Sequence, residues 1–167
     1  MSNSFSQRVN RQLLLAQQQL DKEVDTSNAS GRLRQLGMLE AALFHLYRGY
    51  LEMLRELAEN YQLESPESLA DVAELQEALM AVDKTPAEIQ ELVELQTRGF
   101  VADLLAAWHS LFQGPGSTPS KAGSTRPDGL ISMRQIGEAE LEREKLVTWL
   151  SRLREISDRH RDIMVEY

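Results

Sequence analysis

The residue types best suited to chemistry lie near the C-terminus, in the segment RLREISDRH. Arg154 and His160 are separated there by five residues. A histidine titrates near neutral pH and can take a proton from a hydroxyl, while an arginine can stabilise negative charge that develops on a phosphate. Such a pair could accept a proton and stabilise an anion.

This pair also fits a known pattern, Arg-x4-6-His late in a helical bundle, and so resembles the ribonuclease motif of the HEPN superfamily. The resemblance implies that Arg154 and His160 activate the RNA 2′-hydroxyl and stabilise phosphate charge. Two observations oppose it. His160 falls on an apolar stripe of its predicted helix, where a core histidine is expected, and the net charge of −8 disfavours RNA.

Other signatures of catalysis or metal binding are absent from the sequence. The chain of 167 residues contains no cysteine, which excludes disulfides, thiol catalysis and cysteine zinc sites. The Glu-x-x-His spacing of di-iron bundles does not occur, nor does His-Glu-x-x-His or Gly-x-Ser-x-Gly. We therefore expect no cofactor and no metal.

Negative charge is concentrated in one stretch. Between Leu63 and Thr97 there are nine acidic residues and a single basic one, Lys84, so this stretch carries the whole net charge of the protein. A basic protein surface would complement it, whereas nucleic acid is disfavoured. We expect partner-binding residues on this acidic face, namely Glu67, Asp71, Glu74, Glu77, Glu88 and Glu91.

Hydrophobic spacing predicts about six helices, over residues 4–25, 32–62, 66–82, 86–98, 100–112 and 138–165. Ser65-Pro66 and the capping box Thr85-Pro86-Ala87-Glu88 are predicted helix starts. The second helix carries two adjacent heptad seams, so it needs at least two partner helices. The seams are Leu36, Leu39, Leu43, Leu46, Tyr50, Met53 and Leu57, and Phe44, Tyr47, Leu51, Leu54, Ala58 and Tyr61.

These features predict an all-α fold, an up-and-down bundle of four arms whose third arm is segmented. We expect one domain over residues 1–167. Residues 114–129 form a predicted flexible linker, because 12 of these 16 residues are Gly, Pro, Ser or Thr.

Three blocks of the sequence resemble an uncharacterised bacterial family known only as a domain of unknown function. They are AALFHLYRGYLEMLRELAENYQL, LVELQTRGFVADLLAAWHSLFQ and REKLVTWLSRLREI. The resemblance implies an all-helical cytoplasmic bacterial protein, and it implies no activity, cofactor or site.

The function expected from the sequence is therefore that of a non-enzymatic cytoplasmic interaction or adaptor protein. It would bind a basic partner through the acidic face and could form a homodimer, and no membrane segment is expected. The alternative is a HEPN-like ribonuclease or RNA-interacting bundle. A third hypothesis is a ligand cavity of several hundred Å3 inside the bundle, lined by aromatic residues of the second helix.

Overall fold

Every regular element that the structure describes is helical, as the hydrophobic spacing predicts. The computed structural model describes residues 4–113 and 141–165. Within those ranges there are six α-helices, one short 3-10 helix and no strand. The elements are α1 (Ser4–Leu20), α2 (Ala29–Asn60), η1 (Pro66–Ser68), α3 (Val72–Ala81), α4 (Ala87–Arg98), α5 (Phe100–Ser110) and α6 (Arg143–Val165). The predicted linker at residues 114–129 lies outside the described residues.

The long helix α2 is the centre of the bundle. It contacts α1, α6, α5, η1 and α3, so both of its seams have covering partners. Leu43, Leu46 and Leu54 are completely buried. Burying one such side chain contributes roughly 2 kcal/mol, which makes the two seams the main source of stability. Phe44 departs from the prediction, since 43% of its surface is exposed.

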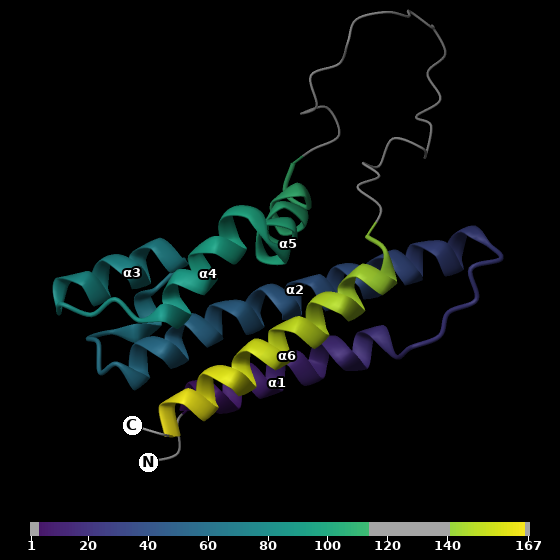
Figure 1. Cartoon of the computed structure of the whole chain (residues 1–167). Coiled ribbons are helices and arrows are strands. Elements are labelled where there is room, and N and C mark those ends of the chain that lie inside the picture. The colour runs from purple at the N-terminus through teal and green to yellow at the C-terminus, as the bar shows by residue number, and fades with distance from the viewer. Residues whose placement is uncertain (1–3, 114–140, 166–167) are drawn as a thin grey trace, which may run out of the picture.

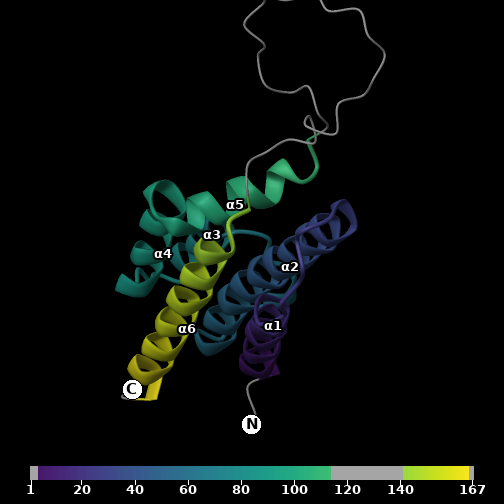
Figure 2. The ribbon, with the colours of Figure 1, turned by 90° about the vertical axis from the view of Figure 1, so that its right-hand side faces the viewer.

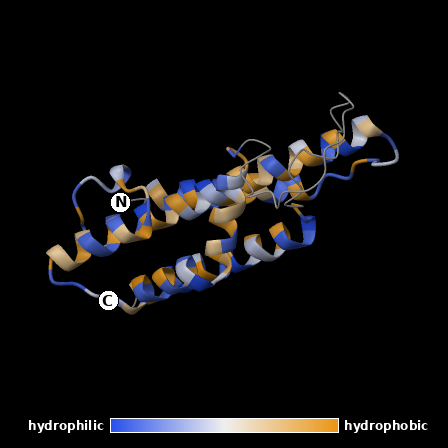
Figure 3. Cartoon of the chain, turned by 90° about the horizontal axis from the view of Figure 1, so that it is seen from above, coloured by the Kyte–Doolittle hydropathy of each residue, from blue (hydrophilic) through white to orange (hydrophobic). Residues whose placement is uncertain are grey.

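α1 and α2 pack against each other as an antiparallel pair, and α6 runs in the same direction as α2 (Figure 1). Figure 1 shows α1 and α6 alongside α2, with α3, α4 and α5 on its other side as the segmented third arm. Seen from the side in Figure 2, α6 and α1 flank α2. The start of α1 and the end of α6 lie at the same end of the bundle. Polar and apolar residues are mixed along each helix, as amphipathic packing requires (Figure 3).

Two predicted boundaries around the first two helices are wrong. The first helix ends at Leu20 and not at about residue 25. The second begins at Ala29, three residues earlier than predicted, because the Asn28 side chain accepts a hydrogen bond from the backbone N–H of Gly31 at 2.7 Å. The loop between them packs tightly on α2, since a Cβ on Gly31 would lie 1.7 Å from the carbonyl oxygen of Asp25.

Both predicted starts in the third arm are also wrong. Ser65 adopts a left-handed conformation (φ 53°) and makes no capping hydrogen bond, so residues 66–68 form only the short helix η1. The cap of α3 is Asp71, whose side chain accepts from the Glu74 N–H at 2.9 Å. Thr85 does not cap α4, whose preceding residue is Pro86. The start of α6 at Arg143 replaces the predicted start near 138, which lies outside the described residues.

Candidate functional site

Arg154 and His160 contact different neighbours from different sides of α6. The Arg154 guanidinium donates to the Gln17 side chain on α1 at 3.0 Å. His160 is 3% exposed, and its Nε2 lies 3.5 Å from a carboxylate oxygen of Glu91 on α4. Residues six apart on an α-helix differ by about 120° around its axis. The structure therefore does not bring this pair to one cleft.

His160 is a neutral, enclosed imidazole. Neither of its ring nitrogens has a hydrogen-bond partner among the described residues, and the same holds for the buried hydroxyl of Ser157. Burial lowers the pKa of His160 below its ordinary value, and the carboxylates of Glu91 and Glu88 oppose only part of that shift. Arg159, the neighbouring cation, lowers the pKa further. This arrangement matches the core histidine that the apolar stripe predicts.

Three of the six residues assigned to the acidic face are exposed. Glu67 of η1 and Glu74 and Glu77 of α3 are exposed. Glu74 also accepts from the backbone N–H of Ala70 at 2.8 Å, while Asp71 caps the helix. Asp71 and Glu74 thus satisfy amides at the start of α3, and their negative charge is favourable at that helix terminus.

Glu88 and Glu91 make contacts within the bundle, although Glu91 stays partly exposed. Glu88 is buried and accepts a hydrogen bond from the Tyr61 hydroxyl. Desolvation, together with this carboxylate, raises the pKa of Tyr61 above its ordinary value. Glu91 accepts from Arg159 of α6 and lies beside His160. The exposed acidic surface is therefore smaller than the sequence indicates, and it centres on η1 and α3.

The outer side of α3 combines carboxylates with small and flexible apolar side chains. Ala73, Met80 and Ala81 are exposed beside Glu74 and Glu77. Met80 keeps 59% of its surface exposed, and no lysine or arginine occurs in Val72–Ala81. We call Glu67, Ala73, Glu74, Glu77, Met80 and Ala81 the α3 face. Methionine adapts readily to different partners, and carboxylates attract basic ones.

Two buried carboxylates on α2 are not among the residues that the sequence patterns single out. Glu52 is 1% exposed and lies within ion-pair distance of the guanidinium groups of Arg8, Arg48 and Arg55. The spacing of Arg48, Glu52 and Arg55 along one helix face is the signal that could have revealed it. The role of Glu52 is to stabilise the fold, because it lies inside the bundle with its charge compensated by three cations.

The second of these carboxylates, Glu56, joins three helices. Its two oxygens accept from Nε and Nη2 of Arg161 at 2.8 and 3.0 Å. The same guanidinium donates to the Asn10 side chain at 3.0 Å and to the Ser6 carbonyl at 3.4 Å. The pKa of Arg161 is raised by this hydrogen bonding with Glu56. No local spacing could predict this contact, since Glu56 and Arg161 lie on different helices.

An aromatic cluster joins α2 to the end of α5. Tyr47 and Trp108 stack with ring centroids 4.6 Å apart, and Phe44 and Phe112 both contact Trp108. Phe112 is 71% exposed, so this cluster is at the surface. Phe44 and Tyr47 therefore belong to a surface cluster, whereas Tyr50 is buried and its hydroxyl donates to the Gln96 side chain at 2.8 Å.

Two further properties concern the described part of the chain. No helix within it is both long and apolar enough to span a membrane. No group of three or more His, Asp or Glu side chains within it is arranged to hold a metal ion.

The profile of a known family, described as "Family of unknown function (DUF6586)", matches residues 1–167. The chain belongs to this family. The match covers all of the sequence, so it includes both the acidic stretch and the segments that form α1 and α6. Comparison of this DUF6586 member with curated proteins and with solved structures found no match.

Proposed function

We propose that this DUF6586 protein is a non-enzymatic interaction protein that binds a basic amphipathic helix of another protein through the α3 face. The observation that carries the proposal is the exposed side of α3, where Glu74 and Glu77 accompany Ala73, Met80 and Ala81 and no lysine or arginine occurs within the helix. The nearest cation in sequence is Lys84, which lines a small pocket with Met80 after the end of α3. A cytoplasmic location and a homodimer, both expected from the sequence, remain predictions.

The chemistry of this face favours a helix as its occupant. Alanine side chains are short, so a partner helix can approach the α3 backbone closely, while Met80 provides an adaptable apolar contact. Lysine or arginine side chains on the edges of that partner would then reach Glu67, Glu74 and Glu77. Binding should weaken as the salt concentration rises, because the charges involved are exposed.

The test uses the full chain and a synthetic amphipathic helix of about 18 residues with leucine on one face and lysine on its edges. A second peptide carries glutamate in place of lysine. Affinity is measured by fluorescence anisotropy over a salt series. We expect the lysine peptide to bind and the glutamate peptide not to bind. Equal affinity for the two peptides would show that the charges of the α3 face do not guide binding.

The decisive variant is E67K with E77K, because neither side chain has a described internal partner to lose. Each exposed pair contributes up to about 1 kcal/mol, so reversing both should cost about 2 kcal/mol, or about 30-fold in affinity. The matched control is E155K with D162K, two exposed positions on α6 that change the net charge equally. Equal losses in both variants would show that only net charge matters and would overturn the proposal.

A further inference from the structure

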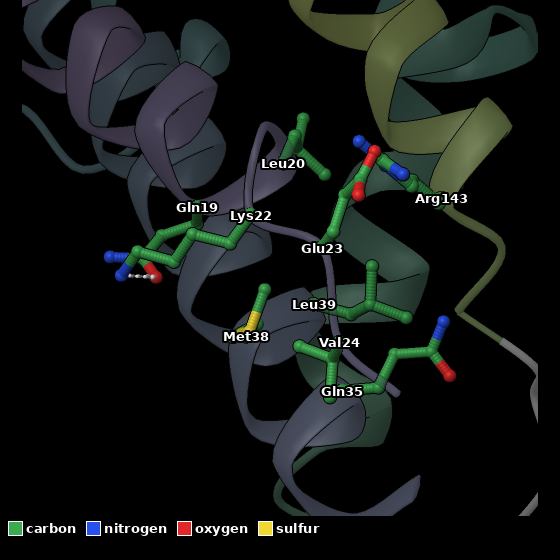
Figure 4. A pocket seen from close by; sticks show the side chains of 9 residues that line it. All are labelled: Gln19, Leu20, Lys22, Glu23, Val24, Gln35, Met38, Leu39 and Arg143. Carbon is green, nitrogen blue, oxygen red and sulfur yellow. Dashed lines mark hydrogen bonds between the residues drawn. The ribbon is translucent and has the colours of Figure 1, made fainter. Parts of the chain in front are cut away.

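A cavity of about 290 Å3 lies where the end of α1, the loop at residues 21–28, α2 and the first residue of α6 meet (Figure 4). It is separate from the α3 face and contains no aromatic side chain. The lining residues are Gln19, Leu20, Lys22, Glu23, Val24, Gln35, Met38, Leu39 and Arg143.

The walls of this cavity are fixed by contacts of their own. Leu20 is 2% exposed and anchors the end of α1 in the core. The loop is held by the Asn28 cap on Gly31 and by a 2.9 Å hydrogen bond from the Ser27 N–H to the Asp25 side chain. The Asp25 carbonyl also lies directly against Gly31 at the start of α2. The site is therefore formed without a ligand, as most small-molecule sites are.

The lining has an apolar floor and, around it, charged and amide groups that supply most of its exposed area. Leu20, Val24, Met38 and Leu39 make the floor. Glu23 and Arg143 come from different elements, and Figure 4 shows their charged groups directed toward the same part of the opening. Neither has an ion pair or side-chain hydrogen bond within the part of the chain that the structure describes. The other lining cation, Lys22, donates to Gln19 at 3.0 Å.

We propose that this cavity binds a small zwitterion with an aliphatic body, of which a free aliphatic amino acid such as leucine is the simplest case. Its carboxylate would pair with the planar guanidinium of Arg143, its ammonium would pair with Glu23, and its side chain would lie on the apolar floor. The volume is at the lower limit for ligand sites, which favours a molecule of this size over a nucleotide.

Three probes with the same aliphatic body distinguish the contributions of the two charged groups to binding. They are leucine, 4-methylpentanoate, which lacks the ammonium, and 3-methylbutylamine, which lacks the carboxylate. Each is titrated into the full chain and followed by amide NMR shifts. Leucine should bind saturably and shift residues 20–24, 38 and 39, with both analogues weaker by about tenfold. Absence of saturation by leucine up to about 10 mM, or equal binding of all three probes, would overturn the proposal.

Two variants assign the charges. R143Q should weaken leucine about tenfold and leave the binding of the amine unchanged, whereas E23Q should weaken leucine and leave 4-methylpentanoate unchanged. R11Q, which removes an exposed arginine on α1 outside the cavity, is the matched control and should change nothing. If R11Q weakens leucine as much as R143Q does, the effect is not local and the site is not the one proposed.

Discussion

Replacing Arg161 by methionine should strongly destabilise the fold, because it leaves a buried carboxylate without its partner. Glu56 is 4% exposed, and both of its oxygens accept from Arg161. Removing one member of a buried ion pair typically costs 3–5 kcal/mol. The Arg161 side chain is 25% exposed, so water can reach part of the site, and we expect a loss of about 2–4 kcal/mol. That is a large fraction of the stability of a typical domain.

The assay is urea unfolding followed by circular dichroism, with the free energy of unfolding extrapolated to water. A double variant, E56L with R161M, removes both charges and should recover most of the loss, since apolar replacement of a buried pair is often neutral. R159M is the matched control on the same helix. Its partner Glu91 is 38% exposed, so this change should cost less than about 1 kcal/mol.

Two results would refute the reasoning about Arg161. One is an equal loss of stability in R161M and R159M, which would show that burial of the carboxylate does not set the cost. The other is a double variant no more stable than R161M alone, which would show that lost packing, and not the unpaired Glu56, is responsible.

Three further outcomes follow from burial and backbone geometry. Burial lowers the pKa of His160 below 6.5 in the folded protein, so the unfolded chain takes up the proton at a higher pH than the folded one. Stability should therefore fall as the pH drops from about 6.5 toward the lower folded pKa. Urea midpoints measured across this pH range should show a smaller decline for H160Q. G37A should stabilise the chain by up to about 1 kcal/mol, since nothing lies within 4 Å of the added Cβ. G31A should destabilise the chain, because its Cβ would collide with the Asp25 backbone. Thermal unfolding midpoints measure both effects. L54A should cost about 2–5 kcal/mol in urea unfolding, because the side chain is completely buried, and a loss below 1 kcal/mol would mean that the seam is not packed as described.

Helix periodicity predicts the fold class and the central helix because both depend on residues close together in sequence. The two seams of α2 require cover on two sides, and the structure provides it. The exceptions arise where a distant partner decides. Glu88 does not return to Thr85, because the Tyr61 hydroxyl takes its carboxylate. Ser65 does not start a helix, because its backbone is left-handed and Asp71 caps α3 instead.

The candidate sites are less predictable than the helices. The α3 face could be predicted in part, since charge is visible in the sequence, yet the removal of Glu88 and Glu91 from it depends on tertiary contacts with Tyr61 and Arg159. The cavity beside Arg143 could not be predicted, because it joins the connection between α1 and α2 to the start of α6, which comes much later in the sequence. A pattern such as Arg154 with His160 shows spacing alone, and only the side-chain directions decide whether two groups meet.

The contact between Glu56 and Arg161 has a consequence for how the protein is made. Glu56 leaves the ribosome more than a hundred residues before its cation does, and α1 and α2, which follow one another directly, can pair while translation continues. Until α6 emerges, that helical hairpin has an uncompensated acid on the side that α6 will cover. Emergence of α6 is therefore the event that closes the bundle, and chains that break off before Arg161 should be natural substrates for quality-control proteases.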